Sequence, residues 1–82
     1  MPGTIEITNI NEAAYLMTRG GVIEYSEIDR DGFVKFYFRD AKKIQQYLAD
    51  LFVNKATVKA KSFIENLMYV KREITKKKRG NR

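Results

Sequence analysis

The sequence contains no cysteine and no histidine among its 82 residues. Without cysteine, the chain can form neither a disulfide framework nor a thiolate zinc site, and it has no thiol nucleophile. Without histidine, it also lacks the side chain that most often serves as a general base. We therefore expect a protein that is not an enzyme and that uses no metal or other cofactor.

Long apolar runs are missing as well. No segment approaches the roughly 18 apolar residues of a membrane span, and residues 1–4 lack the basic-then-apolar layout of a secretory signal. The chain has no tryptophan, and no Phe-rich helix face outside the expected core marks a membrane-surface element. We expect a soluble, cytoplasmic protein that does not bind membranes.

The whole chain has a net charge of +6, and its positive charges are concentrated in the second half. Residues 1–40 contain four Lys or Arg against seven Asp or Glu, a net charge of −3. Residues 41–82 contain twelve against three, a net charge of +9. Such a cluster is typical of a protein that binds a polyanion, most often nucleic acid. The alternative is a solvated surface that keeps a small protein in solution.

A β-hairpin is predicted over residues 22–38, around the turn 29–32. Its second strand has apolar side chains at every second position, as expected for one face against a core: Val34, Phe36 and Phe38. The spacing of Asp29 and Asp31 resembles the start of a calcium-binding loop. The remaining ligand positions of such a loop are missing, because a strand begins at Phe33. We assign both carboxylates to turn geometry.

Three helices and one further strand complete the prediction. Residues 4–8 alternate β-branched and polar side chains, which favours a strand. An Asn-capped helix follows and stops at Gly20-Gly21. The next two helices begin after candidate caps at Asp40 and Thr57. Their apolar residues recur at three- and four-residue steps: Ile44, Tyr47, Leu48, Leu51 and Phe52 in the first, and Ala60, Phe63, Leu67, Val70 and Ile74 in the second, broadened by Ile64 and Met68.

The resulting order is β-α-β-β-α-α, an α+β fold in which three helices cover one face of a small antiparallel sheet. We assign residues 1–75 to a single domain. Residues 76–82 form a basic tail with no apolar anchor, which we expect to be disordered beyond the last helical turn.

Two groups of residues are candidates for contacting nucleic acid. On the second hairpin strand, Phe33, Lys35 and Tyr37 share one face, where rings between cations suit base stacking and phosphate contact. The second group is a set of cations that could follow a phosphate backbone: Lys71, Arg72, Lys76, Lys77, Lys78, Arg79 and Arg82. The alternatives are cross-strand packing for the aromatic residues and a solubilising end for the tail.

The strand at residues 32–38 resembles the aromatic signature of an RNA recognition motif. It departs from that signature at Asp31, where the motif has Lys or Arg, and at Lys35, where it has a stacking aromatic residue. The predicted chain also ends in a helix instead of a fourth strand. The resemblance implies base stacking on the exposed rings.

A second resemblance covers residues 5–74. The elements that carry it are the helix Ala13–Gly20, the hairpin end Phe36–Asp40, and the helical region with Asn54 and Phe63. They are similar to a family of short uncharacterised proteins, a domain of unknown function, from bacterial and phage or prophage genomes. The resemblance implies a mobile-element origin, the host cytoplasm as location and a small α+β fold. It supplies no catalytic residues.

These observations favour a small non-enzymatic nucleic-acid-binding accessory protein, phage or mobile-element encoded, that contacts phosphates of DNA or RNA through its basic C-terminal helix and tail. The wide apolar stripe of that helix supports a different hypothesis. It predicts a protein-interaction module, either a phage-encoded inhibitor or adaptor of a host protein or a homodimer joined through the last helix.

Overall fold

The structure is a computed structural model that describes residues 3–53 and 57–80. Its elements are β1 (Ile5–Ile7), α1 (Ile10–Thr18), β2 (Ile23–Ile28), β3 (Val34–Phe38), α2 (Ala41–Phe52) and α3 (Ala60–Gly80). This order confirms the predicted β-α-β-β-α-α fold of the α+β class. Among the described residues, no helix combines the length and the apolar composition that crossing a membrane requires.

The three strands form one antiparallel sheet in the order β1-β3-β2, with β3 in the centre. Phe36 lies opposite Ile7 of β1 and Ser26 of β2. The pairing of β2 is irregular between Ile23 and Tyr25. The alternation along β3 determines which side of the sheet is covered, because its three inward side chains are buried: Val34, Phe36 and Phe38.

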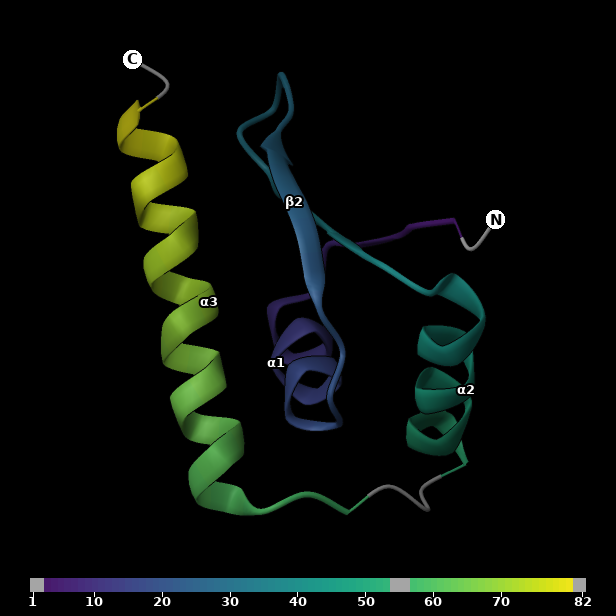
Figure 1. Ribbon diagram of the computed structural model, residues 1–82. Helices are drawn as coiled ribbons and strands as arrows, with labels where there is room; N and C mark the ends of the chain where they lie inside the picture. The colour runs from purple at the N-terminus through teal and green to yellow at the C-terminus, as the bar shows by residue number, and fades with distance from the viewer. Residues whose placement is uncertain (1–2, 54–56, 81–82) are drawn as a thin grey trace.

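The helices lie on one side of the sheet, with α1 between α2 and α3 (Figure 1). The buried hydrophobic residues come from β1, β3 and all three helices: Ile7, Ala13, Ala14, Tyr15, Leu16, Val34, Phe36, Phe38, Ile44 and Val70. The longest helix, α3, runs along one edge of the molecule (Figure 1). One side of α3 therefore packs on the core, and the opposite side faces solvent.

Both ends of α1 confirm the prediction. The Asn9 side-chain oxygen accepts hydrogen bonds from the backbone N–H groups of Asn11 and Glu12, at 2.9 and 3.0 Å. At the other end, Gly20 has a φ of +107°, which favours glycine. The N–H of Gly21 donates to the carbonyl of Leu16 at 2.7 Å.

The turn between β2 and β3 confirms that its first carboxylate serves the turn. One oxygen of Asp29 accepts hydrogen bonds from the backbone N–H groups of Asp31 and Phe33, at 2.9 and 3.0 Å. Gly32 has a φ of +85° and donates to the carbonyl of Asp29 at 3.1 Å. The Asp29 carboxylate is thus engaged by the backbone.

One predicted helix cap is right in position but does not cap with its side chain, and the other is wrong. Asp40 precedes α2 but has a φ of 63°, in the left-handed region, and its side chain makes no capping hydrogen bond. A capping residue normally has extended backbone geometry, which directs its side chain toward the first helical N–H groups. The first helical hydrogen bond of α3 runs from the N–H of Phe63 to the carbonyl of Lys59, at 3.0 Å. Thr57 therefore lies before the capping position.

Phe52 differs from the prediction that it faces the core, and the two residues that broaden the stripe of α3 lie outside the core. Phe52, the last residue of α2, is 71% exposed. Ile64 and Met68 of α3 are each 54% exposed. Phe63, Val70 and Ile74 of α3 pack on the core with Leu67 half-buried on the same side, and the two extra residues lie on the solvent side.

The basic tail also differs from the prediction, because α3 continues through residues 76–80. Lysine and arginine are good helix formers. Cations in the last helical turn also interact favourably with the negative end of the helix dipole, and α3 has Lys77, Lys78 and Arg79 there. Asn54, which carried part of the family resemblance, and Arg82 lie outside the described residues.

Candidate functional site

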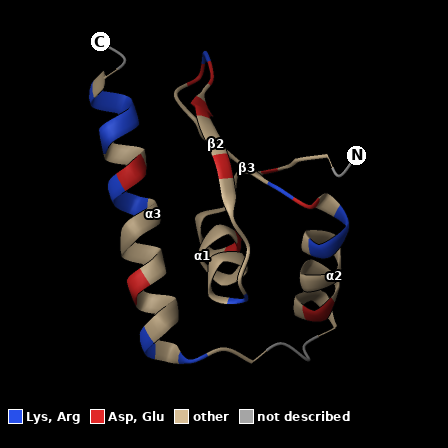
Figure 2. Ribbon diagram, in the orientation of Figure 1, with Lys and Arg blue, Asp and Glu red and all other residues tan. Residues whose placement is uncertain are grey.

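The C-terminal half of α3 contains a group of cations, shown in blue in Figure 2, and most of them are exposed to solvent. We call it the basic face. Five residues of α3 line its shallow hollow of about 350 Å³: Lys71, Arg72, Thr75, Lys76 and Arg79. They follow the i, i+1, i+4, i+5, i+8 spacing of one helix side. The helical structure through Gly80 brings them together.

The charges of the basic face are largely unneutralised. Lys76 contacts the Glu73 carboxylate at 3.4 Å, in an exposed pair of the kind that contributes little energy. Within residues 3–53 and 57–80, no carboxylate forms an ion pair with Lys71, Arg72 or Arg79. Each of these side chains is exposed and able to reach an external anion.

The remaining predicted cations do not join this face. Lys77 is half-buried and lies with Ser26 and Glu27 in a second hollow, between β2 and α3, which Lys76 of the basic face also lines. Lys78 is exposed but outside the basic face. Arg82 lies beyond the described part of the helix. The structure thus brings together four of the seven predicted cations.

The aromatic and basic residues of β3 lie on the outer face of the sheet, but their neighbours engage them. The Lys35 ammonium is 3.9 Å from the Glu6 carboxylate. The Tyr37 ring stacks on the Tyr25 ring, with centroids 4.5 Å apart. Phe33, before β3, is 66% exposed. Lys35 and Tyr37 thus take part in cross-strand pairs, as the packing alternative predicts, whereas the Phe33 ring stays exposed.

Two acidic neighbours change the electrostatics of the outer face. The Glu27 carboxylate, by hydrogen bonding to the phenol, is the main reason that the pKa of Tyr37 rises from 10.0 to about 12. Arg39 contacts Glu24 at 2.8 Å. Unlike the basic face of α3, this surface contains its own counter-charges.

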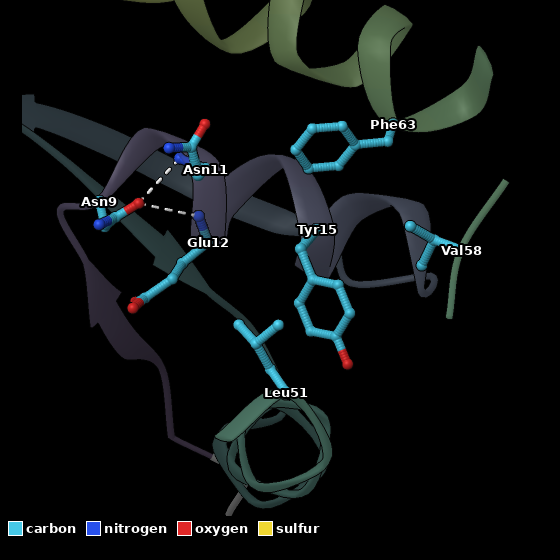
Figure 3. A pocket seen from close by; sticks show the side chains of 7 residues that line it. All are labelled: Asn9, Asn11, Glu12, Tyr15, Leu51, Val58 and Phe63. Atoms are coloured by element: carbon cyan, nitrogen blue, oxygen red, sulfur yellow. Dashed lines mark hydrogen bonds between the residues drawn. The ribbon is translucent and has the colours of Figure 1, made fainter. Parts of the chain in front are cut away.

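Sequence reasoning missed a hollow of about 390 Å³ between the three helices (Figure 3). It is lined by Asn9, Asn11, Glu12, Tyr15, Leu51, Val58 and Phe63. Leu51 comes from α2 and Phe63 from α3, on either side of Tyr15 of α1 (Figure 3). No local sequence signal could have predicted this hollow, because its walls come from segments far apart in the chain.

A hydrogen-bonded group beside this hollow connects α1 to α2. The Tyr15 hydroxyl donates to the Tyr47 carbonyl at 2.8 Å and accepts from the Arg19 guanidinium at 2.7 Å. The same guanidinium contacts Asp50 at 3.1 Å and lies 4.6 Å from the centre of the Tyr47 ring. The Asp50 hydrogen bond is the main reason that the pKa of Arg19 is raised. Since every polar group here has a partner, we interpret this cluster as structural.

The described residues contain no group of three or more His, Cys, Asp or Glu side chains placed to hold a metal ion. The chain matches the family described as a domain of unknown function (DUF5659) over residues 2–76. No curated protein matches the chain, and no solved structure does.

Proposed function

The chain belongs to the DUF5659 family, and for this member of a family of unknown function we propose a non-enzymatic role in binding nucleic acid. The basic face of α3 contacts phosphates, and the protein acts as a small accessory protein. We further propose that it is encoded by a phage or mobile element and acts in the host cytoplasm, as the resemblance to phage and prophage proteins suggests.

The observation that carries this proposal is the clustering of unneutralised cations on one side of one helix. Lys71, Arg72, Lys76 and Arg79 share the hollow on α3, and their net attraction for a polyanion adds across the face. The acidic Glu27 of β2 lies on a different side of α3, where it lines a second hollow with Lys76 and Lys77. The side of α3 that carries Arg72 and Arg79 is therefore the one that we expect to turn toward the nucleic acid.

Salt-dependent binding tests the proposal. If the four cations each neutralise a phosphate of duplex DNA, the slope of log K against log salt is about −3.6. Affinity then falls roughly 150-fold between about 50 and 200 mM salt. Deleting residues 76–82 removes Lys76 and Arg79, two of the four cations, and halves the slope to about −1.8.

A matched pair of double variants controls for total charge. Arg72→Gln with Lys76→Gln removes two charges from the basic face. The slope of log K against log salt should become less steep by about 1.8. Lys42→Gln with Lys43→Gln removes two exposed charges from α2 and leaves the slope unchanged. No detectable binding to single- or double-stranded DNA or RNA at low salt contradicts the proposal.

The second candidate function is protein association through α3. Ile64 and Met68 are each 54% exposed, and Tyr69 is 40% exposed. These residues occupy the solvent side of the helix before the basic face begins, and exposed apolar groups of this kind are typical of partner surfaces. Light scattering of the intact protein should show a molecular mass that rises with protein concentration. The double variant Ile64→Ser with Met68→Ser should have the mass of a monomer at every concentration. A monomeric mass at every concentration contradicts self-association.

A further inference from the structure

The basic face of α3 has a middle line and two edges. Successive residues of an α-helix are rotated by about 100° around its axis. This rotation places Arg72, Thr75 and Arg79 along the middle of the face. Lys71 lies on one edge and Lys76 on the other. The face therefore presents guanidinium and hydroxyl groups in its centre and ammonium groups at its margins.

The shape of this region suits insertion into a groove. The hollow on the basic face is lined by residues of α3 alone. Val70, on the opposite side of the helix, is completely buried against the core. From Lys71 to Arg79 the face is about 12 Å long, and a helix with its side chains is about 10–12 Å wide. The major groove of B-form DNA is about 12 Å wide, so it admits a helix of this size.

We propose that the basic face enters the major groove of duplex DNA, an inference that rests on the nucleic-acid binding proposed above. Lys71 and Lys76 contact phosphates on the two sides of the groove. Arg72 and Arg79 face the base edges and donate hydrogen bonds to O6 and N7 of guanine, the commonest specific contact of arginine. Thr75 lies between them.

The groups that Thr75 can offer to a base are limited by its own helix. Its hydroxyl donates to the carbonyl of Lys71 at 3.2 Å. The methyl group and a lone pair of the hydroxyl oxygen remain available. A methyl group can contact the thymine methyl, and the oxygen can accept from an exocyclic amino group. The middle line therefore combines two arginine side chains that can donate to guanine with one threonine that can contact different bases.

The same geometry disfavours other nucleic acids. In A-form RNA the major groove is deep and narrow, and side chains do not reach its base edges. Non-specific binding of single strands uses aromatic platforms for base stacking, whereas the five residues of the basic face include no aromatic ring. Duplex DNA is therefore the substrate class that the basic face fits.

Replacing guanine N7 tests groove entry directly. The probes are a GC-rich DNA duplex and the same duplex in which 7-deazaguanine replaces guanine, which removes a major-groove acceptor and leaves the phosphates intact. We expect the intact protein to bind the deaza duplex about fivefold more weakly or worse. Arg72→Lys with Arg79→Lys keeps the charge but loses the planar paired donors of arginine, so this variant should distinguish the two duplexes less than the intact protein does.

The outcomes separate this inference from the proposed function. Equal affinity of the intact protein for both duplexes, with a steep salt slope, would mean phosphate contact without groove entry and overturns the inference alone. Tighter binding to duplex RNA of the same sequence also overturns it. No binding to these duplexes, or to single strands of the same sequence, at low salt overturns both proposals. Far-UV circular dichroism of each variant confirms that α3 is still folded.

Discussion

Single residues determine how closely the end of α1 approaches the rest of the core. A Cβ atom on Gly21 would lie 2.9 Å from the carbonyl oxygen of Leu16. It would also lie 3.0 Å from a methyl group of Ile44 and 3.1 Å from the Phe38 ring. The first contact is with backbone, which cannot rotate away. The sequence predicts the helix stop from the two glycines, but the need for glycine at the second one comes from packing.

Gly21→Ala should therefore destabilise the fold by roughly 1–3 kcal/mol, the usual cost of forcing an extra carbon into a packed region. Urea unfolding measures this change. Gly3→Ala is the matched control, because a Cβ there meets nothing within 4 Å, and it should change stability by less than about 0.5 kcal/mol. Equal unfolding midpoints for the two variants would contradict the packing argument.

Tyr37 provides a prediction of pH dependence. Its folded-state pKa is raised from 10.0 to about 12, mainly by the Glu27 carboxylate. The folded protein thus holds the phenol proton more tightly than the unfolded chain. The associated stability is present below pH 10 and is lost as the pH rises from 10 toward 12.

The titration of the Tyr37 ring, followed by NMR, checks this assignment. Glu27→Gln should lower the pKa of Tyr37 toward 10, because the charged acceptor is gone. Glu12→Gln alters a carboxylate in the first turn of α1 that is not among the groups raising the pKa of Tyr37, and it should leave the titration unchanged. A Tyr37 pKa near 10 in the unmodified protein would show that Glu27 does not act on the phenol.

At the scale of elements, α3 shows what a periodic sequence can and cannot predict. The three- and four-residue spacing correctly predicts a long helix with Phe63, Leu67, Val70 and Ile74 on one side. The period does not determine how wide the buried arc is, because neighbouring elements decide that. Ile64 and Met68 therefore remain exposed despite their apolar character.

The two sides of α3 should respond differently to truncation. Val70 is completely buried, so Val70→Ala should cost about 2 kcal/mol for the lost burial and the cavity left behind. Ile64→Ala removes a larger side chain from the solvent side, and alanine is the better helix former. It should change stability by less than about 0.5 kcal/mol. Thermal or urea unfolding distinguishes them, and an equal loss would place Ile64 in the core.

The basic face also depends on the whole element. The residue types are visible in the sequence, which contains Lys71, Arg72, Lys76 and Arg79. Their alignment on one side of a helix is not visible in the sequence. A disordered tail would have separated Lys76 and Arg79 from Lys71 and Arg72. Helical structure through Gly80 is what converts a basic stretch into a surface. The helix continues through these residues because the helix propensity of lysine and arginine outweighs the lack of apolar residues that would anchor them to the core.

At the scale of the whole molecule, the fold pairs the cations of the sheet with carboxylates but leaves most cations of the basic face unpaired. The sheet pairs its cations with carboxylates, at Lys35 with Glu6 and at Arg39 with Glu24. The basic face of α3 has no comparable neutralisation within the described chain, apart from the exposed contact of Lys76 with Glu73. The sequence predicts two candidate surfaces, and the tertiary pairing distinguishes them.

The hollow between the three helices belongs to this scale as well. It exists because α2 and α3 flank α1 and leave a space beside the Tyr15 ring (Figure 3). A sequence pattern describes one element at a time, so it predicts the apolar residues of each helix but not the space left between them.

Amide chemical-shift mapping during titration with duplex DNA tests the central claim most directly. The account predicts that the largest shifts lie in residues 71–80 of α3. The shifts at Lys35 and Tyr37 on the sheet, and at Tyr15 beside the hollow, should remain small. Large shifts confined to the sheet or the hollow, with residues 71–80 unmoved, would contradict the claim that the basic face of α3 is the nucleic-acid interface.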